Sequence, residues 1–240
     1  MRSLPRLSLC AALLGGAPVA PLLAQAPFAA LGTDVPYQYY AGLGITLDQL
    51  TLTYRAGLPG PPYPGIVARG MGAIGLDEVY VDLIGDSFAG GWLNTFSVQV
   101  RGGRERHWAF GIDLRHDRLA AEASATELLG PVVGPAFTAA LALAGGDDTG
   151  ARVATVLTGA GLRISRDVPL GRRRRHALRL DFSLAKYLDA RTALSFDGER
   201  LASLEPIASQ LAADILSREI FDPYGYVGGL GVAYVHRLGP

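Results

Sequence analysis

Apolar and polar residues alternate with a period of two along much of this chain. In the stretch from Trp92 to Arg101, the even-numbered residues are mainly apolar and the odd-numbered residues are mostly polar. The alternation resumes from 107 to 115, after the short turn at 102–105. Because successive side chains of a strand point to opposite faces of a sheet, the two stretches predict an antiparallel β-hairpin.

Several other stretches have the same period. Residues 176–186 alternate cleanly, and 192–197 look like their short return strand. Residues 50–54 predict an early strand, which 43–47 extend through a bulge near Asp48. Weaker strands are expected at 72–83 and 153–165, and a final strand at 224–238. The pattern predicts about eight strands in total.

Two segments do not alternate. Residues 128–146 carry no charge, but Pro131, Pro135 and internal glycines argue against a membrane-spanning helix, and basic flanking residues are missing. This segment is either two further strands, giving about ten, or a helical insertion, leaving about eight. Residues 202–219 place apolar side chains at helical spacing and predict an amphipathic helix that packs on a sheet or caps one end of it.

The polar faces of the strands indicate which side of the sheet is inside. They carry charges of both signs together with glycine and alanine, which suits the crowded lumen of a narrow barrel better than a solvated surface. The predicted lumen network consists of Arg101, Asp113, Arg115, Arg163, Arg179 and Asp181. Aromatic residues near strand ends are predicted to lie at a membrane interface, and these are Trp92, Trp108, Tyr187, Tyr224 and Tyr226.

The fold class that follows is all-β. We expect a closed antiparallel transmembrane β-barrel of about 8–10 strands, with helical or irregular insertions near 117–150 and 198–222. The alternative for the same alternation is a soluble barrel or sandwich, in which the apolar faces point inward.

The first residues predict a secretory signal peptide. Arg2 and Arg6 precede an apolar stretch from 7 to 23, and small residues around Ala24 offer a cleavage site. We expect cleavage after Ala24, which leaves residues 25–240 as a single barrel domain. The only cysteine, Cys10, lies in the predicted leader, so disulfides, thiol nucleophiles and cysteine-ligated metals are not expected in the mature protein.

The leader, the alternating strands and the last segment, 229–236, together resemble bacterial outer-membrane β-barrel proteins as a class. That last segment is similar to the carboxy-terminal strand signal read by barrel-assembly machinery, although that signal normally ends in an aromatic residue and here Arg237-Leu238-Gly239-Pro240 follows. The resemblance implies a location in the outer membrane, with membrane lipid and the assembly machinery as partners. A formal net charge of zero gives no reason to expect nucleic-acid binding.

No catalytic constellation is evident, so the catalytic residues are unknown and no cofactor or metal is expected. The four histidines, His107, His116, His176 and His236, have no metal-ligand spacing, and no phosphate-binding loop or nucleophile elbow is present. We expect a non-enzymatic barrel of structural, adhesive or small-pore type. A barrel enzyme acting on envelope lipids would need a histidine and a serine or carboxylate converging at one rim. A soluble barrel that binds a hydrophobic ligand would need its apolar faces turned inward.

Overall fold

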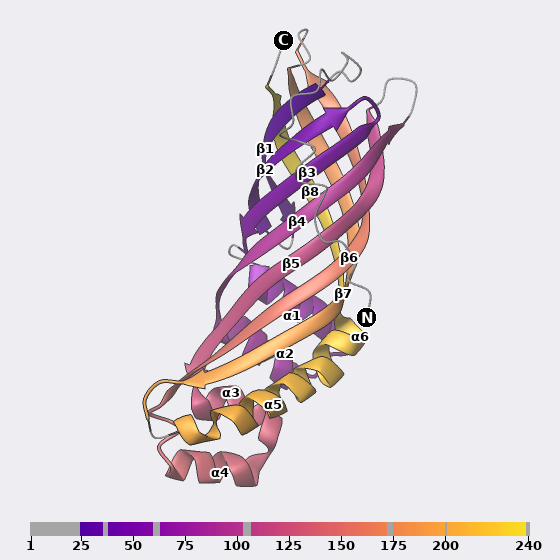
Figure 1. The fold of residues 1–240 in the computed structure, drawn as a ribbon. Coiled ribbons are helices and arrows are strands. Elements are labelled where there is room, and N and C mark those ends of the chain that lie inside the picture. The colour runs from indigo at the N-terminus through magenta and orange to yellow at the C-terminus, as the bar shows by residue number, and fades with distance from the viewer. Residues whose placement is uncertain are drawn as a thin grey trace, which may run out of the picture.

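The structure is a computed structural model that describes residues 25–35, 38–59, 63–102, 107–171, 175–199 and 201–238. Eight antiparallel strands form a closed barrel in sequence order, and β8 pairs with β1 to complete the ring (Figure 1). The strands are β1 (Gln25–Val35), β2 (Gln38–Leu47), β3 (Leu50–Leu58), β4 (Phe88–Gly102), β5 (Trp108–Ser124), β6 (Gly150–Leu170), β7 (His176–Phe196) and β8 (Tyr226–Arg237). The expected closed antiparallel barrel is confirmed.

The strands differ in length, so the two ends of the barrel differ. β6 and β7 have 21 residues each, whereas β1, β2, β3 and β8 have 9 to 12. The long strands therefore continue past the short ones as a half-open wall toward the lower end of Figure 1. We call this the helical end, and we call the opposite end, where β1 begins and β8 finishes, the terminal end.

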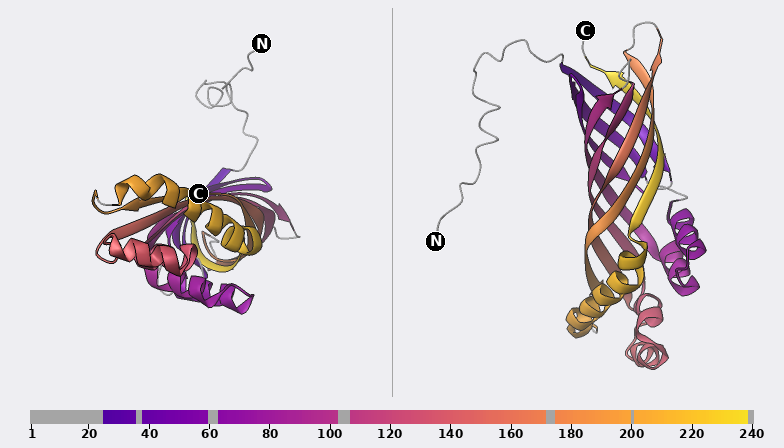
Figure 2. Two further views of the ribbon diagram at one scale, coloured as in Figure 1. Left: turned by 90° about the horizontal axis from the view of Figure 1, so that it is seen from below. Right: turned by 90° about the vertical axis from the view of Figure 1, so that its right-hand side faces the viewer.

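Helices occupy the three long connections, and all of them lie at the helical end (Figures 1 and 2). The β3–β4 connection contains α1 (Tyr63–Ala73) and α2 (Glu78–Ser87), and the β5–β6 connection contains α3 (Ala125–Val133) and α4 (Pro135–Leu143). The β7–β8 connection contains η1 (Ala202–Leu204), α5 (Glu205–Ile215), the π-helical turn η2 (Leu216–Phe221) and α6 (Asp222–Tyr224). Buried leucines and alanines of α3 and α5 pack against Leu194 and Phe196 at the end of β7.

The segment at 128–146 forms two short helices, which settles the strand number at eight. A capping box starts α3, because the Ser124 hydroxyl accepts from the Glu127 amide and the Glu127 carboxylate accepts from the Ser124 amide. Gly134, with φ of 80°, separates α3 from α4, and Pro135 opens α4. Among the described residues, no helix has the length and apolar character needed to cross a membrane.

One predicted strand and one predicted extension of a strand are wrong, whereas the strand at 50–54 is confirmed as part of β3. Residues 72–83 belong to α1, α2 and their connection, where Gly75 has a positive φ and the Asp77 carboxylate accepts from the Val79 amide to cap α2. Residues 43–54 do not form one bulged strand. They form a hairpin in which Leu47 pairs with Leu50, and Asp48 turns the chain with a φ of 50°.

The predicted return strand at 192–197 is also wrong, because 176–196 is one strand with a bulge. Thr158 of β6 pairs with Asp189 and the next residue, Gly159, pairs with Tyr187, so Leu188 is an extra residue. One extra residue shifts every following side chain to the other face. Leu184, before the bulge, points outward and is exposed, whereas Leu194, after it, points inward and is buried.

Candidate functional site: the barrel interior and its helical end

The outer surface of the barrel is apolar. Phe110, Ile112 and Leu114 on β5 are each 50% exposed, and Leu180 and Phe182 on β7 are exposed to a similar degree. The residues between them face the interior and are mostly buried. The predicted orientation is therefore confirmed, and it is the opposite of what a soluble barrel with a hydrophobic interior requires.

The interior is filled with paired charges. Five arginines and five aspartates are buried among the described residues, so these ten side chains carry no net charge at neutral pH. Buried ions of this kind must be paired and hydrogen-bonded, because a lone charge loses its hydration without compensation. The ten residues are Asp34, Arg55, Arg101, Asp113, Arg115, Asp117, Arg163, Asp167, Arg179 and Asp181.

In the layer of the lumen nearest the terminal end, one carboxylate accepts hydrogen bonds from two guanidinium groups. Asp167 on β6 accepts from Arg179 Nε at 2.7 Å and Nη2 at 3.1 Å, and from Arg101 Nη2 at 2.8 Å. Arg101 Nε also donates to Thr51 Oγ1 at 2.9 Å. Arg179 lies over the ring of Phe28, 5.0 Å from its centroid. This layer links β1, β3, β4, β6 and β7 across the lumen.

In the middle of the barrel, two arginines share three aspartates. Arg163 Nε donates to Asp113 at 2.7 Å, and the two Nη atoms of Arg163 lie 3.4 Å from Asp34 and 3.6 Å from Asp181. Arg55 Nη2 lies 3.2 Å from Asp181, and Arg55 Nη1 lies 3.8 Å from Asp34. These contacts span the barrel from β1 and β3 to β5, β6 and β7, so side chains cross its axis.

Small residues on β2 and β8 leave the space that the interior side chains occupy. A Cβ added at Gly231 would overlap Asp34 Oδ1 and approach Asp181 Cβ to 3.0 Å. A Cβ added at Gly44 would overlap the ring of Phe28. A larger residue at either position would therefore force neighbouring atoms to move, and neither glycine has a positive φ.

A third layer lies closest to the helical end. Arg115 Nε donates to Asp117 Oδ2 at 3.2 Å, and Tyr187 Oη donates to the same oxygen at 2.5 Å. Arg115 also lies over the Tyr187 ring, 5.9 Å from its centroid. Tyr187 was predicted to lie at a membrane interface, and this is corrected: the bulge at Leu188 follows it, so its side chain still points into the barrel.

The structure places all six predicted lumen residues in the buried interior. The side chain of each forms an ion pair with the side chain of another residue. Sequence reasoning missed four further members, Asp34, Arg55, Asp117 and Asp167. The latter three lie on β3, β5 and β6, at the same alternate positions as the other inward-facing polar residues of these strands. Continuing the alternation along each strand would have identified them. Asp34 lies on β1, which follows the predicted leader and was not recognised as a strand.

Three of the other four predicted interface aromatics lie on the outside. Trp92, Trp108 and Tyr226 are exposed on the outer surface, and Trp92 Nε1 donates to Asn94 Oδ1 at 2.8 Å. Arg166 lies over the Trp108 ring at 5.1 Å, and Lys186 over the Tyr226 ring at 5.1 Å. Tyr224 ends α6, and its side chain lies outside the part of the structure that is described.

Two of the four histidines meet near the terminal end. His176 on β7 pairs with His236 on β8, and their Nδ1 atoms are 3.2 Å apart. Tyr234 Oη lies 2.5 Å from His176 Nδ1. Within the described residues, no group of three or more metal-ligating side chains is found. His176 therefore contacts both His236 and Tyr234.

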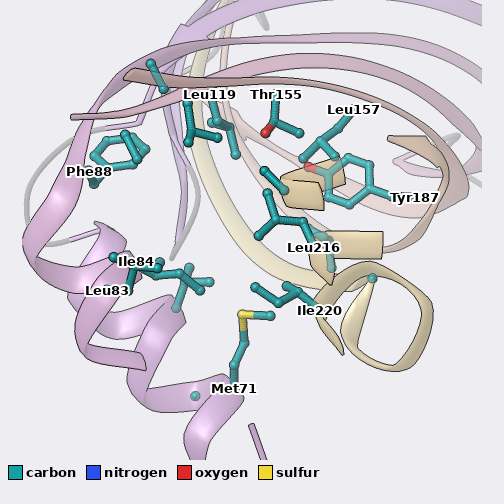
Figure 3. A pocket seen from close by; sticks show the side chains of 18 of the residues that line it. Met71, Leu83, Ile84, Phe88, Leu119, Thr155, Leu157, Tyr187, Leu216 and Ile220 are labelled. Carbon is teal, nitrogen blue, oxygen red and sulfur yellow. The ribbon is translucent and has the colours of Figure 1, made fainter. Parts of the chain in front are cut away.

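The interior changes from polar to apolar toward the helical end. On β6 the inward residues run from Asp167 and Arg163 through glycines to Leu157 and Val153. Beyond Tyr187 this apolar lining encloses a cavity of about 440 Å³ between the strands and the helices (Figure 3). Because most of the short strands have already ended there, α1, α2 and η2 form the other wall of the cavity.

No protein-family model matches the chain, and none of the curated proteins matches it in sequence. Among solved structures, it is similar to a major outer membrane protein of Thermus thermophilus, with 12% identity, 90% of this chain and 100% of that chain covered, and a TM-score of 0.43. It is also similar to CarO of Acinetobacter baumannii, with 8% identity, 89% and 97% covered, and a TM-score of 0.38. For CarO2 of the same organism the values are 8%, 89%, 98% and 0.36.

Proposed function

We propose that this chain spans a bacterial outer membrane as a non-conducting β-barrel of structural or adhesive type. The observation that carries the proposal is the distribution of polarity over the closed sheet: apolar side chains cover the outside and paired charges fill the inside. A sheet can cross hydrocarbon only if every backbone group is hydrogen-bonded within a closed ring. The apolar outer surface and the closed ring of strands both match a membrane-spanning barrel and disfavour a soluble one.

The two tryptophans mark out a band of the right height. Trp92 opens the outward face of β4, and Trp108 pairs with Gly102, ten residue steps further along that strand. At about 3.3 Å per residue and a tilt of about 40°, ten steps rise by about 25 Å. The lipid-facing band of outer-membrane barrels is also about 25 Å tall, with aromatic residues at both edges.

The packed interior supports a closed barrel over the small-pore alternative. An eight-stranded barrel is just wide enough to be filled by its own side chains. Here Arg55, Arg163 and Arg179 are almost fully buried. Arg55 on β3 reaches Asp181 on β7, and Arg163 on β6 reaches Asp34 on β1, so both side chains cross the lumen. An ion crossing the barrel would have to separate these pairs.

The connections indicate an orientation. In bacterial outer-membrane barrels the short turns face the periplasm and the long loops face outward. The long helical connections of this chain share one end, which we assign to the cell surface, where an adhesive or structural role would be exerted. The terminal end then faces the periplasm, where assembly machinery would meet β8, the strand that closes the ring with β1.

Fractionation and conductance together test the proposal. The full chain should appear in the outer-membrane fraction and migrate differently on a gel before and after boiling, as a folded membrane barrel does. The purified barrel should add no stepwise current to a planar lipid bilayer. Recovery in the soluble periplasmic fraction would contradict the membrane location, and regular ohmic steps would contradict the closed lumen.

A further inference from the structure

The cavity at the helical end has no role in membrane spanning or in sealing the lumen. Its walls come from the strands and from helices of all three long connections. Figure 3 shows Met71 of α1 and Ile84 of α2 facing Leu216 and Ile220 of η2, with Leu157 on the barrel side. These helices pack against the extended strands, so the cavity is formed by packed elements of secondary structure and not by loops.

The chemistry of the lining selects an apolar occupant. None of the residues that line the cavity is charged. Three side chains with hydroxyl groups line it, Thr155, Tyr187 and Tyr226. Tyr187 Oη donates to Asp117, and Thr155 Oγ1 lies 3.1 Å from Thr192 Oγ1. A ligand here is offered dispersion contacts and exclusion from water, without a charged or strongly polar anchor.

The cavity is open at its side. Ile66 of α1 and Ile74, in the turn that follows α1, line it and are also exposed, the latter to 68%. Tyr226 lines it too, and it lies at the edge of the apolar outer surface, where Lys186 covers its ring. The mouth therefore adjoins the surface that we assign to lipid, and an extended apolar molecule could enter while its polar end stays near the membrane interface.

We propose that this cavity binds one alkyl chain, either of a membrane lipid or of a free fatty acid. Its volume of about 440 Å³ falls within the range of about 300–1,000 Å³ found for small-molecule pockets. Cavities with purely apolar walls stay dry and bind apolar molecules, and each buried methylene strengthens binding about fourfold. The inference goes beyond the proposed membrane barrel and can fail without affecting it.

Chain length provides the primary test. Saturated fatty acids of increasing length should displace a fluorescent fatty acid from the full barrel in lipid nanodiscs, with signals corrected against nanodiscs that lack protein. Affinity, expressed against the free aqueous concentration of each acid, should rise about fourfold per methylene and then level off once the cavity is filled. A continuous rise without a plateau would indicate partition into the bilayer and would overturn the proposal.

A pair of glycine substitutions makes the test specific. Gly70 of α1 lines the cavity, and a Cβ added there meets no atom within 4 Å, so a side chain can begin there without a clash at its Cβ, and Gly70→Phe is designed to place its ring in the cavity. Excluding two methylenes of the ligand would weaken binding about fifteenfold. Gly85→Phe is the matched control, because Gly85 of α2 also has open space around it but does not line the cavity.

The source of the chain is distinguished by a second arm. A phospholipid with a photoreactive tail is placed in the nanodisc, and crosslinks are mapped by mass spectrometry. Crosslinks to the Met71 segment that Gly70→Phe abolishes and Gly85→Phe retains would identify a membrane lipid as the occupant. Saturable displacement without such crosslinks would identify a free fatty acid. If neither saturable displacement nor crosslinking were observed, the proposal would be overturned. Heat-modified migration checks that each variant folds, and Met71→Trp serves as a second filling variant if Gly70→Phe does not.

Discussion

Replacing Asp167 with alanine removes a carboxylate that binds both Arg101 and Arg179. Asp167 accepts three hydrogen bonds from the two guanidinium groups, at 2.7, 2.8 and 3.1 Å. Asp167 and Arg179 are almost fully buried, and Arg101 is 8% exposed. Alanine in place of Asp167 would leave both arginines inside the barrel without this partner.

Breaking a buried ion pair by removing one partner typically costs about 3–5 kcal/mol, because the remaining charge is uncompensated. We expect Asp167→Ala to lower the free energy of unfolding by this amount. Urea unfolding of the barrel in lipid vesicles, followed by tryptophan fluorescence, measures it. With a slope of about 2 kcal/mol per molar, the midpoint should fall by about 1.5–2.5 M.

The matched control is Asp189→Ala. Asp189 also pairs with an arginine, Arg191, at 3.1 Å, but both side chains are more than half exposed. A surface substitution of this kind should change stability by no more than about 0.5 kcal/mol. If Asp167→Ala were no more destabilising than Asp189→Ala, the interior charges would be solvated and the closed, charge-paired lumen would be refuted.

Two further predictions concern the outside and the packing of the lumen. Phe110→Arg and Leu180→Arg should reduce the folded protein in outer membranes, because both side chains lie on the apolar outer face; the cost is about 2–4 kcal/mol at mid-depth in the bilayer and smaller toward the interface. Normal assembly of both variants would contradict the lipid-facing assignment. Ala154→Arg is the control and should assemble normally, because Ala154 is exposed on β6 and pairs with Ala120, two residues beyond Arg118, the partner of Trp92. Gly231→Leu should prevent formation of the heat-modifiable species, because its side chain would occupy the space of the central ion pairs. Gly102→Leu, where an added Cβ meets nothing within 4 Å, should fold, and equal folding of the two variants would show that the lumen is not packed.

Alternation identified the faces of the sheet correctly because it depends only on the two-residue geometry of a strand. It failed where this geometry is interrupted. Leu47 and Leu50 are both apolar, so a two-residue turn between them resembled a continuous strand with a bulge. In β7 the reverse occurred: an extra residue at Leu188 switched the apolar side chains from the outer to the inner face, and one strand was interpreted as two.

Pairing within the lumen could not be predicted from the sequence for a different reason. Partners such as Arg55 and Asp181 lie on strands that are not neighbours, and their contact depends on barrel closure and diameter. The cavity was missed for the same reason, because it arises from unequal strand lengths and from α1 and α2, where a strand was expected. A local signal for α2 was present in Asp77 followed by Glu78, an N-cap with an acidic first turn.

The central claim, that the apolar outer surface meets hydrocarbon, is tested most directly by tryptophan quenching with brominated lipids. Trp92 and Trp108 are the only tryptophans in the chain, so Trp92→Phe and Trp108→Phe together give a background in which Ile112→Trp reports from the middle of the band. We predict that its fluorescence is quenched most by bromines deep in the acyl chains and is insensitive to aqueous iodide. Quenching by iodide, with no effect of bromines at any depth, would contradict the account.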